Sequence, residues 1–152
     1  MSFKNILCFG TLNPDLIYFV DELPNKGDDI RSLKSSIRPG GTAINCSELI
    51  SLWDKSVHIR GNSIGSDPMG KYLVDYLKEN NINFDGLIIN QSLTPTCSIF
   101  VDSSGERTIV SSGYEGLEWS NFENLNNFDS LIIDRYSIKF IKDKLKDLKK
   151  QN

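Results

Sequence analysis

The sequence has few of the residues that build metal sites and disulfide frameworks. It contains one histidine and three cysteines, Cys8, Cys46 and Cys97, which lie far apart and form no C-x-x-C pair. Such spacing supports neither a zinc site nor a disulfide framework, and reduced thiols are typical of cytoplasmic proteins. We therefore expect no bound metal, a fold stabilised by its apolar core, and a cytoplasmic location.

Long hydrophobic runs and an excess of basic residues are also missing. The apolar run at residues 6–9 is too short for the core of a signal peptide, and no other run approaches the length that spans a membrane. The formal net charge is −3, which argues against a nucleic acid held by a basic face. These absences leave a small molecule as the expected ligand and exclude a membrane or nucleic-acid partner.

The composition is that of a globular domain. Hydrophobic residues make up 39% and charged residues 24% of the 152 residues, a balance that argues against disorder. A chain of this length buries about 70% of its unfolded surface. Because there is no internal repeat or low-complexity linker, we expect a single domain over residues 1–152.

Three segments are predicted to be helical. Apolar residues recur at helical spacing over residues 42–53, and Thr42 is expected to cap this helix. The second helix extends to Lys78, with Asp67 at the N-cap and Pro68 at the first helical position. A basic amphipathic helix is expected over residues 138–150.

Strands are expected to alternate with these helices, which predicts a parallel α/β sheet. The buried strands are expected at residues 6–10, 57–61, 87–89 and 131–134. Extended segments at 15–20 and 29–37, and a hairpin at 96–111 with its turn at 102–105, interrupt this rhythm. We expect the hairpin to pair with the two extended segments as a small β appendage.

The most informative stretch for function is Arg38-Pro39-Gly40-Gly41-Thr42-Ala43-Ile44-Asn45. Adjacent glycines let the backbone adopt positive φ and approach a ligand closely, and the first amides of the next helix lack intrahelical partners. Asn45, one helical turn further on, offers an amide that donates and accepts, as a polyol requires. Taken alone, however, Gly-Gly before a helix is more often a tight connection than a site.

Four features stand in a fixed order along the chain. They are Gly10-Thr11-Leu12-Asn13-Pro14-Asp15, Pro39-Gly40-Gly41-x-x-x-Asn45, Gly65-Ser66-Asp67-x-x-Gly70, and Thr94-Pro95-Thr96 with Gly105-Glu106-Arg107-Thr108-Ile109. Over nearly the whole chain this order resembles the N-terminal half of the ribokinase-like (PfkB) carbohydrate kinases. Within that family, the stretches at 29–33, 107–110 and 128–135 look most like ketohexokinase.

The resemblance implies both a fold and a site. The fold is a partial Rossmann-type sheet of the ribokinase kind, with helices on both faces and a small β-sheet lid near residues 15–37 and 96–111. The substrate-binding residues that it implies are Asp15, Gly40, Gly41, Thr42, Asn45, Cys97, Ile99 and Asp134. Asp15 would accept hydrogen bonds from sugar hydroxyls, and the glycines would allow close backbone approach. The lid would exclude water and could also mediate a homodimer.

Several of these positions have a second interpretation. Asp15 is alternatively a turn aspartate, and Asn45 a buried amide that ties its helix to a loop. Cys97 and Ile99 either face the sugar or pack within the lid or a dimer contact. Arg107 matches an arginine near the phosphates, where it could stabilise developing charge, or it is an exposed hairpin residue.

Three departures from the family pattern leave the identity of the sugar open. Gly27 stands where ketohexokinases have a sugar-binding aspartate, which leaves Asp28 or Asp29 as the candidate substitutes. Thr42 stands where ribokinases have lysine and ketohexokinases have asparagine. Asp134 stands where the family usually has glutamate, whose side chain is longer.

The resemblance also implies that a C-terminal half is missing. Family members are about twice this length, within the usual range of domain sizes. Their C-terminal half carries a magnesium-associated segment and a Gly-Ala-Gly-Asp motif that supplies the anion hole and the catalytic base. That motif does not occur here, and no P-loop replaces it. ATP and Mg²⁺ are thus implied for the complete enzyme, whereas this chain alone is expected to bind neither well and to be inactive.

Three functions of different classes remain. The favoured one is the sugar-binding half of a carbohydrate kinase, which a C-terminal segment would complete. The second is a non-catalytic module that binds a sugar or nucleoside in the same pocket. The third is a module that dimerises through the lid.

Overall fold

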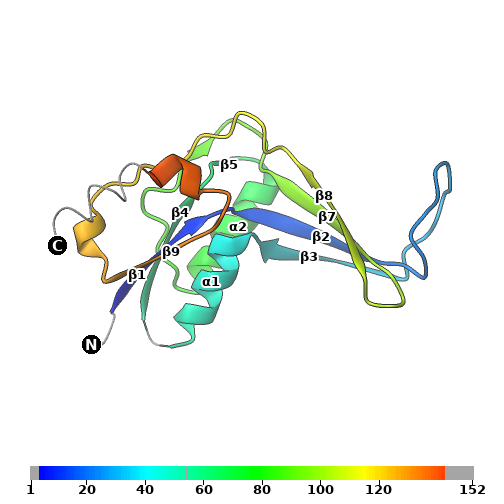
Figure 1. Ribbon diagram of the computed structural model, residues 1–152, viewed down its shortest axis with the longest axis horizontal. Helices are drawn as coiled ribbons and strands as arrows, with labels where there is room; N and C mark the ends of the chain where they lie inside the picture. Colours follow the sequence, from blue (N-terminus) through cyan, green and yellow to red (C-terminus); the bar gives the residue numbers. More distant parts are fainter. Residues whose placement is uncertain (1–3, 54, 143–152) are drawn as a thin grey trace.

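The structure is a computed structural model that describes residues 4–53 and 55–142. Figure 1 shows a body of strands and helices from which a second sheet projects to one side. The body is centred on a parallel sheet of order β4-β1-β9, made of β1 (Asn5–Gly10), β4 (Ser56–Gly61) and β9 (Ser130–Ile133). The expected α/β architecture is confirmed.

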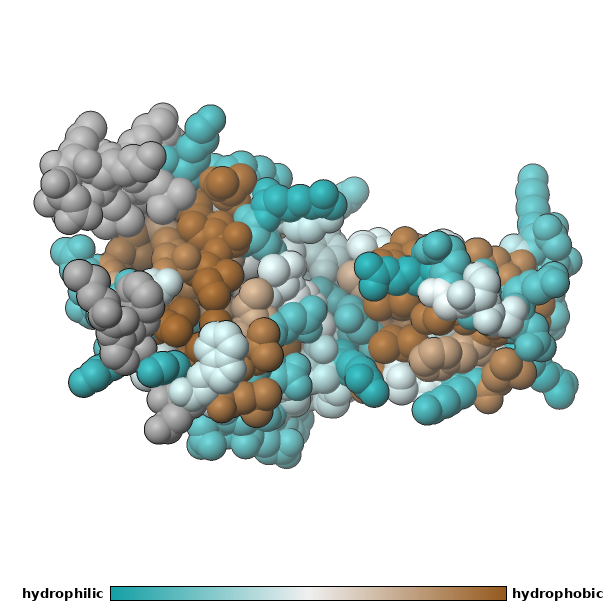
Figure 2. Space-filling view, turned by 60° about the horizontal axis from the view of Figure 1, so that its bottom comes forward, coloured by the Kyte–Doolittle hydropathy of each residue, from teal (hydrophilic) through white to brown (hydrophobic). Residues whose placement is uncertain are grey.

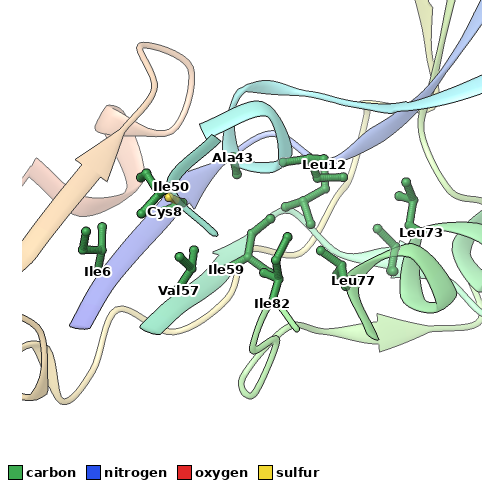
Figure 3. Packing of buried hydrophobic residues seen from close by; sticks show 12 residues of the cluster. Ile6, Cys8, Leu12, Ala43, Ile50, Val57, Ile59, Leu73, Leu77 and Ile82 are labelled. Atoms are coloured by element: carbon green, nitrogen blue, oxygen red, sulfur yellow. The ribbon is translucent and has the colours of Figure 1, made fainter. Parts of the chain in front are cut away.

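The alternation of side chains along β1 divides the core of the body into two layers. Ile6 and Cys8 point to the face that α1 (Thr42–Ser51) and α2 (Pro68–Glu79) cover. Figure 3 shows side chains of both helices, among them Ala43 and Leu77, directed toward this face. Because consecutive strand residues point to opposite faces, Leu7 and Phe9 instead belong to the second layer.

Residues that follow the projecting sheet in sequence cover the second face of the body. Phe122 packs edge-on against Phe9, with ring centroids 5.0 Å apart. Ile141, in the helical residues 138–142, is 1% exposed and belongs to the same cluster. The short 3-10 helix η1 (Leu125–Asn127) also lies in this stretch. Only the first turn of the helix expected at residues 138–150 falls within the described residues.

The projecting sheet has the order β3-β2-β7-β8. Its strands are β2 (Asn13–Phe19), β3 (Lys34–Gly40), β7 (Thr96–Val101) and β8 (Arg107–Ser112). The two outer pairs are antiparallel, and β2 pairs with β7 in parallel. The expected hairpin and its pairing with the earlier extended segments are therefore confirmed.

Three element boundaries differ from the sequence prediction. The second extended segment spans Lys34–Gly40 rather than residues 29–37, because its partner β2 ends at Phe19, opposite Lys34. The strand expected at 87–89 is the two-residue β6 (Ile89–Asn90), which pairs with the equally short β5 (Ile64–Gly65) and leaves Ile89 46% exposed. Helix α1 ends at Ser51, two residues before Trp53.

Apolar side chains remain on the surface of both parts. Figure 2 shows hydrophobic areas over the body and over the projecting sheet, separated by a more polar band. Leu49 on α1 and Trp53 just after it are exposed rather than in the core as expected, and on the projecting sheet Ile109 and Val110 are about half exposed. Among the described residues, no helix combines the length and the hydrophobicity that crossing a membrane requires.

Candidate functional site

A short loop, residues 11–12, joins the body to the projecting sheet between β1 and β2. The fully buried side chain of Asn62 fixes this loop, because Leu12 N donates to Asn62 Oδ1 at 2.8 Å and Asn62 Nδ2 donates to Leu12 O at 3.0 Å. One amide thus satisfies both backbone groups of a buried residue. The side chains on either side of Leu12 are held in place as a result.

Asp15 lies on β2 just beyond this loop, against Asn13 and Gly40. Asn13 Nδ2 donates to Asp15 Oδ1 at 2.6 Å, and a Cβ atom on Gly40 would overlap the same carboxylate. Within the described part of the chain, no hydrogen bond is found to Asp15 Oδ2. Burial raises the pKa of Asp15 above its usual value, and the bond from Asn13 lowers it in part.

Gly40 and Gly41 have different roles. Gly40 lies within β3, paired with Asn13, and its backbone does not adopt the positive φ that the sequence suggested. Gly41 has φ 87° and packs against the carbonyl of Thr11, where a side chain would clash. The missing side chain at Gly40 therefore makes room for Asp15, and only Gly41 requires the conformational freedom of glycine.

Helix α1 begins at Thr42, with Gly41 rather than Thr42 as its N-cap. Thr42 N donates to Thr11 Oγ1 and Ala43 N donates to Thr11 O, both at 3.2 Å. The expected cap was wrong because a residue from a distant loop, Thr11, satisfies these amides. These two amides are consequently engaged within the protein.

Asn45 lies one helical turn after Gly41, with its backbone amide donating to Gly41 O at 3.1 Å. Its side chain is exposed, which rules out the alternative of a buried amide. The side chain of Thr42 is exposed as well. Both remain available to a ligand beside the turn.

Asp134 follows β9 and is 6% exposed. Its Oδ2 accepts from Thr11 N at 2.8 Å and from Thr11 Oγ1 at 3.1 Å, while Oδ1 accepts from Ser137 N at 2.7 Å. Gly10 contributes space, because a Cβ there would lie 2.7 Å from Asp134 Oδ2. Asp134 thus orients Thr11, which in turn holds the start of α1, and its predicted contact with substrate stays a prediction.

One face of the projecting sheet carries the remaining predicted residues. Asp15 is in register with Cys97, and Ile17 with Ile99, so these four side chains share a face. Arg107 lies on the same face but at the far end of the hairpin, opposite Val101. Since Ser111 pairs with Cys97, the four-residue step from Arg107 to Ser111 separates Arg107 from the Asp15 region by about 13 Å along the strand.

Tyr114, in the loop after β8, completes the hydrogen-bonded group around Asp15. Its hydroxyl donates to Asn13 Oδ1 at 2.8 Å and lies 3.7 Å from Cys97 Sγ. Burial is the main cause that raises the pKa of Tyr114, with Cys97 next, so the hydroxyl stays neutral. Sequence reasoning missed Tyr114, because nothing in the local pattern marks it, and missed Thr11 and Asn13 although both stand in the Gly10–Asp15 motif.

The Gly65-Ser66-Asp67-x-x-Gly70 motif joins α2 to the segment that leads into β7. Asp67 caps α2 as predicted, with Oδ1 accepting from Gly70 N at 2.8 Å, and its Oδ2 accepts from Thr94 N at 2.8 Å. Thr94 Oγ1 also donates to Asp67 Oδ1 at 2.7 Å. Burial opposes ionisation, but these hydrogen bonds leave the pKa of Asp67 below its usual value. Asp67 thus anchors the base of the projecting sheet.

Comparison with known proteins gives a consistent picture. The family model for pfkB family carbohydrate kinases matches residues 4–150. The chain is 28% identical over 108 residues to a ribokinase of Dictyostelium discoideum and 30% identical over 112 residues to a ketohexokinase of Mus musculus. These matches cover 70% and 72% of this chain but only 34% and 37% of the two relatives, so it spans about a third of their length.

A solved structure shows the same fold. The ribokinase of Arabidopsis thaliana, complexed with ribose and ATP, superposes with a TM-score of 0.72 at 19% identity. The superposition covers 89% of this chain and 46% of that protein. At this level of identity the likeness establishes the fold.

Proposed function

Because the chain belongs to the pfkB family of carbohydrate kinases, we propose that it is the sugar-binding N-terminal portion of such a kinase. The complete enzyme would transfer a phosphoryl group from ATP to a sugar hydroxyl. The observation that carries the proposal is the arrangement of Asp15 against Gly40, with one carboxylate oxygen held by Asn13 and the other without a protein donor among the described residues. A half-buried carboxylate of this kind binds hydroxyl donors well.

The other predicted residues have complementary parts in this proposal. The exposed Asn45 would donate to and accept from hydroxyls beside the Gly41 turn. Cys97 and Ile99 would line the same face of the projecting sheet, which acts as a lid and keeps water from the acceptor hydroxyl. Thr42 and Asp134 would contribute at the edge of the site. D-ribose and D-fructose are the sugars to test first, since ribokinase and ketohexokinase are among the chain's relatives.

The described residues do not fit ATP or Mg²⁺. The first amides of α1 donate to Thr11, and residues 4–53 and 55–142 contain no group of three acidic, histidine or cysteine side chains that could hold a metal ion. An Asn-x-x-Glu spacing does occur at Asn45 and Glu48, but Glu48 lies beside Tyr76, whose pKa is raised to about 12 by burial first and by Glu48 second. We therefore assign nucleotide binding and the catalytic base to a C-terminal segment and propose that this chain alone is inactive.

Two features of the body support completion by such a segment. Strand β9 pairs only with β1 among the described strands, which leaves an open sheet edge that another strand could join. Near the end of the described chain, Ile138 and Phe140 are about half exposed. Arg107 lies at the far end of the hairpin from Asp15. It would stabilise charge on the phosphates only if the complete enzyme brings ATP to that end.

The test combines binding and turnover. We expect titration calorimetry to detect D-ribose or D-fructose binding by this chain, with the signal lost in Asp15→Asn. Co-expression with the C-terminal portion of a ribokinase should produce ATP-dependent sugar phosphorylation that the chain alone lacks. Absence of both binding by a folded sample and phosphorylation in any pairing would contradict the proposal, whereas binding without phosphorylation would favour the non-catalytic module.

The projecting sheet also supports a homodimer as a further part of the proposal. Ile37 and Val110 are about half exposed, and the strand register places both, with Leu16, on the face of the sheet opposite Asp15. Apolar surface of this kind favours association. Sedimentation velocity should show a dimer that Val110→Lys weakens. A monomer at high concentration would exclude this assembly. The three cysteines are free, which is compatible with the proposed cytoplasmic location.

A further inference from the structure

Tyr114 reaches the group around Asp15 from a separate segment, the loop that follows β8. Its hydroxyl donates to Asn13 Oδ1 at 2.8 Å, and Asn13 is 2% exposed. The second neighbour of the hydroxyl, Cys97 Sγ, lies 3.7 Å away. Tyr114 therefore contacts Asp15 only through the amide of Asn13.

The orientation of the Asn13 amide decides what Asp15 meets. An amide presents an acceptor at one end and donors at the other. With Oδ1 held by Tyr114, Nδ2 is directed to Asp15 Oδ1 at 2.6 Å and to Pro14 O at 3.3 Å. Were the amide turned over, its oxygen would face the carboxylate and the two acceptors would repel each other.

We propose that Tyr114 is a positioning residue for the sugar site, holding Asn13 so that one oxygen of Asp15 is occupied by a donor and the other stays open to a hydroxyl. The inference rests on the proposed function, because acceptance of sugar hydroxyls by Asp15 is part of it. Tyr114 itself need not touch the sugar. It acts on Asp15 through its hydrogen bond to Asn13.

A pH dependence follows from this geometry. The groups that face Asp15 are Arg38 on β3 and Cys97 on β7, both in register with it, and Tyr114 from the loop after β8. Burial raises the pKa of Asp15, and the Asn13 hydrogen bond counteracts that rise. Loosening Asn13 would raise the pKa further, so Asp15 would lose its charge at a higher pH and sugar binding would fail earlier on acidification.

The test removes a single hydroxyl in Tyr114→Phe. Its matched control is Tyr18→Phe, because Tyr18 alternates to the opposite face of the same sheet and stacks on Phe100. The titration midpoint of the Asp15 carboxyl carbon is measured by NMR in each protein. D-ribose and D-fructose affinities are measured across the same pH range by calorimetry.

We expect Tyr114→Phe to raise the Asp15 midpoint by on the order of half a pH unit, with an equal upward shift in the acid limit of sugar binding. Tyr18→Phe should change neither. An unchanged midpoint in folded Tyr114→Phe would overturn the proposal. A shifted midpoint in a protein whose wild type binds neither sugar would support the positioning role of Tyr114 while contradicting the proposed function.

A measurement on the wild type covers the case in which Tyr114→Phe fails to fold. The Asn13 side-chain amide protons should exchange slowly with water and show NOE contacts to the Tyr114 ring. Fast exchange without such contacts would overturn the proposal.

Discussion

The carboxylate of Asp15 occupies the space that a side chain at Gly40 would need. Gly40 lies in regular strand β3 without positive φ, so its lack of a side chain serves the neighbouring carboxylate rather than the backbone. This relationship explains why a glycine belongs at a strand position that otherwise favours larger residues. It also separates the roles of two adjacent glycines that look equivalent in the sequence.

Gly40→Ala should displace the Asp15 carboxylate. We expect a loss of about 1–3 kcal/mol in the free energy of unfolding from overpacking, together with weaker binding of D-ribose or D-fructose. Urea unfolding and calorimetry measure the two effects. Gly105→Ala is the matched control: Gly105 has φ 84°, and nothing lies within 4 Å of where a Cβ would be added, so its substitution should strain the hairpin turn and leave sugar affinity unchanged. Equal affinity in both variants would contradict this account.

Asp15→Asn should abolish sugar binding and yet stabilise the chain. The folded-state pKa of Asp15 is raised above its ordinary value of 3.8, so the unfolded state ionises more readily, and the ionised carboxylate disfavours folding at neutral pH. Because Asp15 is only half buried, we expect a gain of at most about 1 kcal/mol. Urea unfolding at neutral pH measures this gain, which should shrink as the pH falls through the raised folded-state pKa of Asp15 and be absent once the pH is below 3.8. A destabilised variant at neutral pH would contradict the prediction.

Asp67→Ala should have the opposite pH behaviour. The pKa of Asp67 is lowered in the folded state, so its contribution is present above the ordinary value of 3.8 and is lost as the pH falls through the folded-state value. We expect a loss of about 1–2 kcal/mol at neutral pH, typical of an N-cap, and a smaller difference from wild type in acid. Thermal and urea unfolding at several pH values provide the measurement.

The control for Asp67 is Asp75→Ala, which removes the exposed ion pair with Lys71 one helical turn away on α2. An exposed pair of this kind contributes about 0.5 kcal/mol or less. Equal losses in the free energy of unfolding for the two variants would show that the hydrogen bonds between Asp67 and Thr94 contribute no more than an exposed ion pair.

The elements that the sequence predicted correctly are those whose signals are local. Asp67 and Pro68 mark the start of α2, and the turn at residues 102–105 marks the hairpin. Both signals depend on residues a few positions apart, whose backbone preferences act within one turn. The same holds for the buried strand β1.

The sequence could not predict contacts between distant segments. Thr11, rather than Thr42, satisfies the first amides of α1, and β3 begins where β2 supplies a partner rather than where apolar alternation begins. Tyr114 meets Asn13 across 101 positions, and no local pattern marks such a pair. Leu49 fits the helical spacing and is still exposed, because spacing indicates a face but not whether another element covers it.

Asn62→Leu should be the most damaging single substitution near the site. The side chain of Asn62 is fully buried and satisfies both the N–H and the carbonyl of Leu12, and it donates to Ser63 O at 2.9 Å. A leucine of similar size would leave these backbone groups buried without partners, at about 1–3 kcal/mol each. We expect a large loss in the free energy of unfolding measured in urea. In any folded fraction we expect weaker sugar binding, because the loop that orients Thr11 and Asn13 would be released.

Asn80→Leu is the control, since Asn80 donates to Tyr76 O at the end of α2, where it is only partly buried. Its loss should reduce stability by about 1 kcal/mol without affecting sugar affinity. Comparable losses in the two variants would show that the loop does not depend on Asn62.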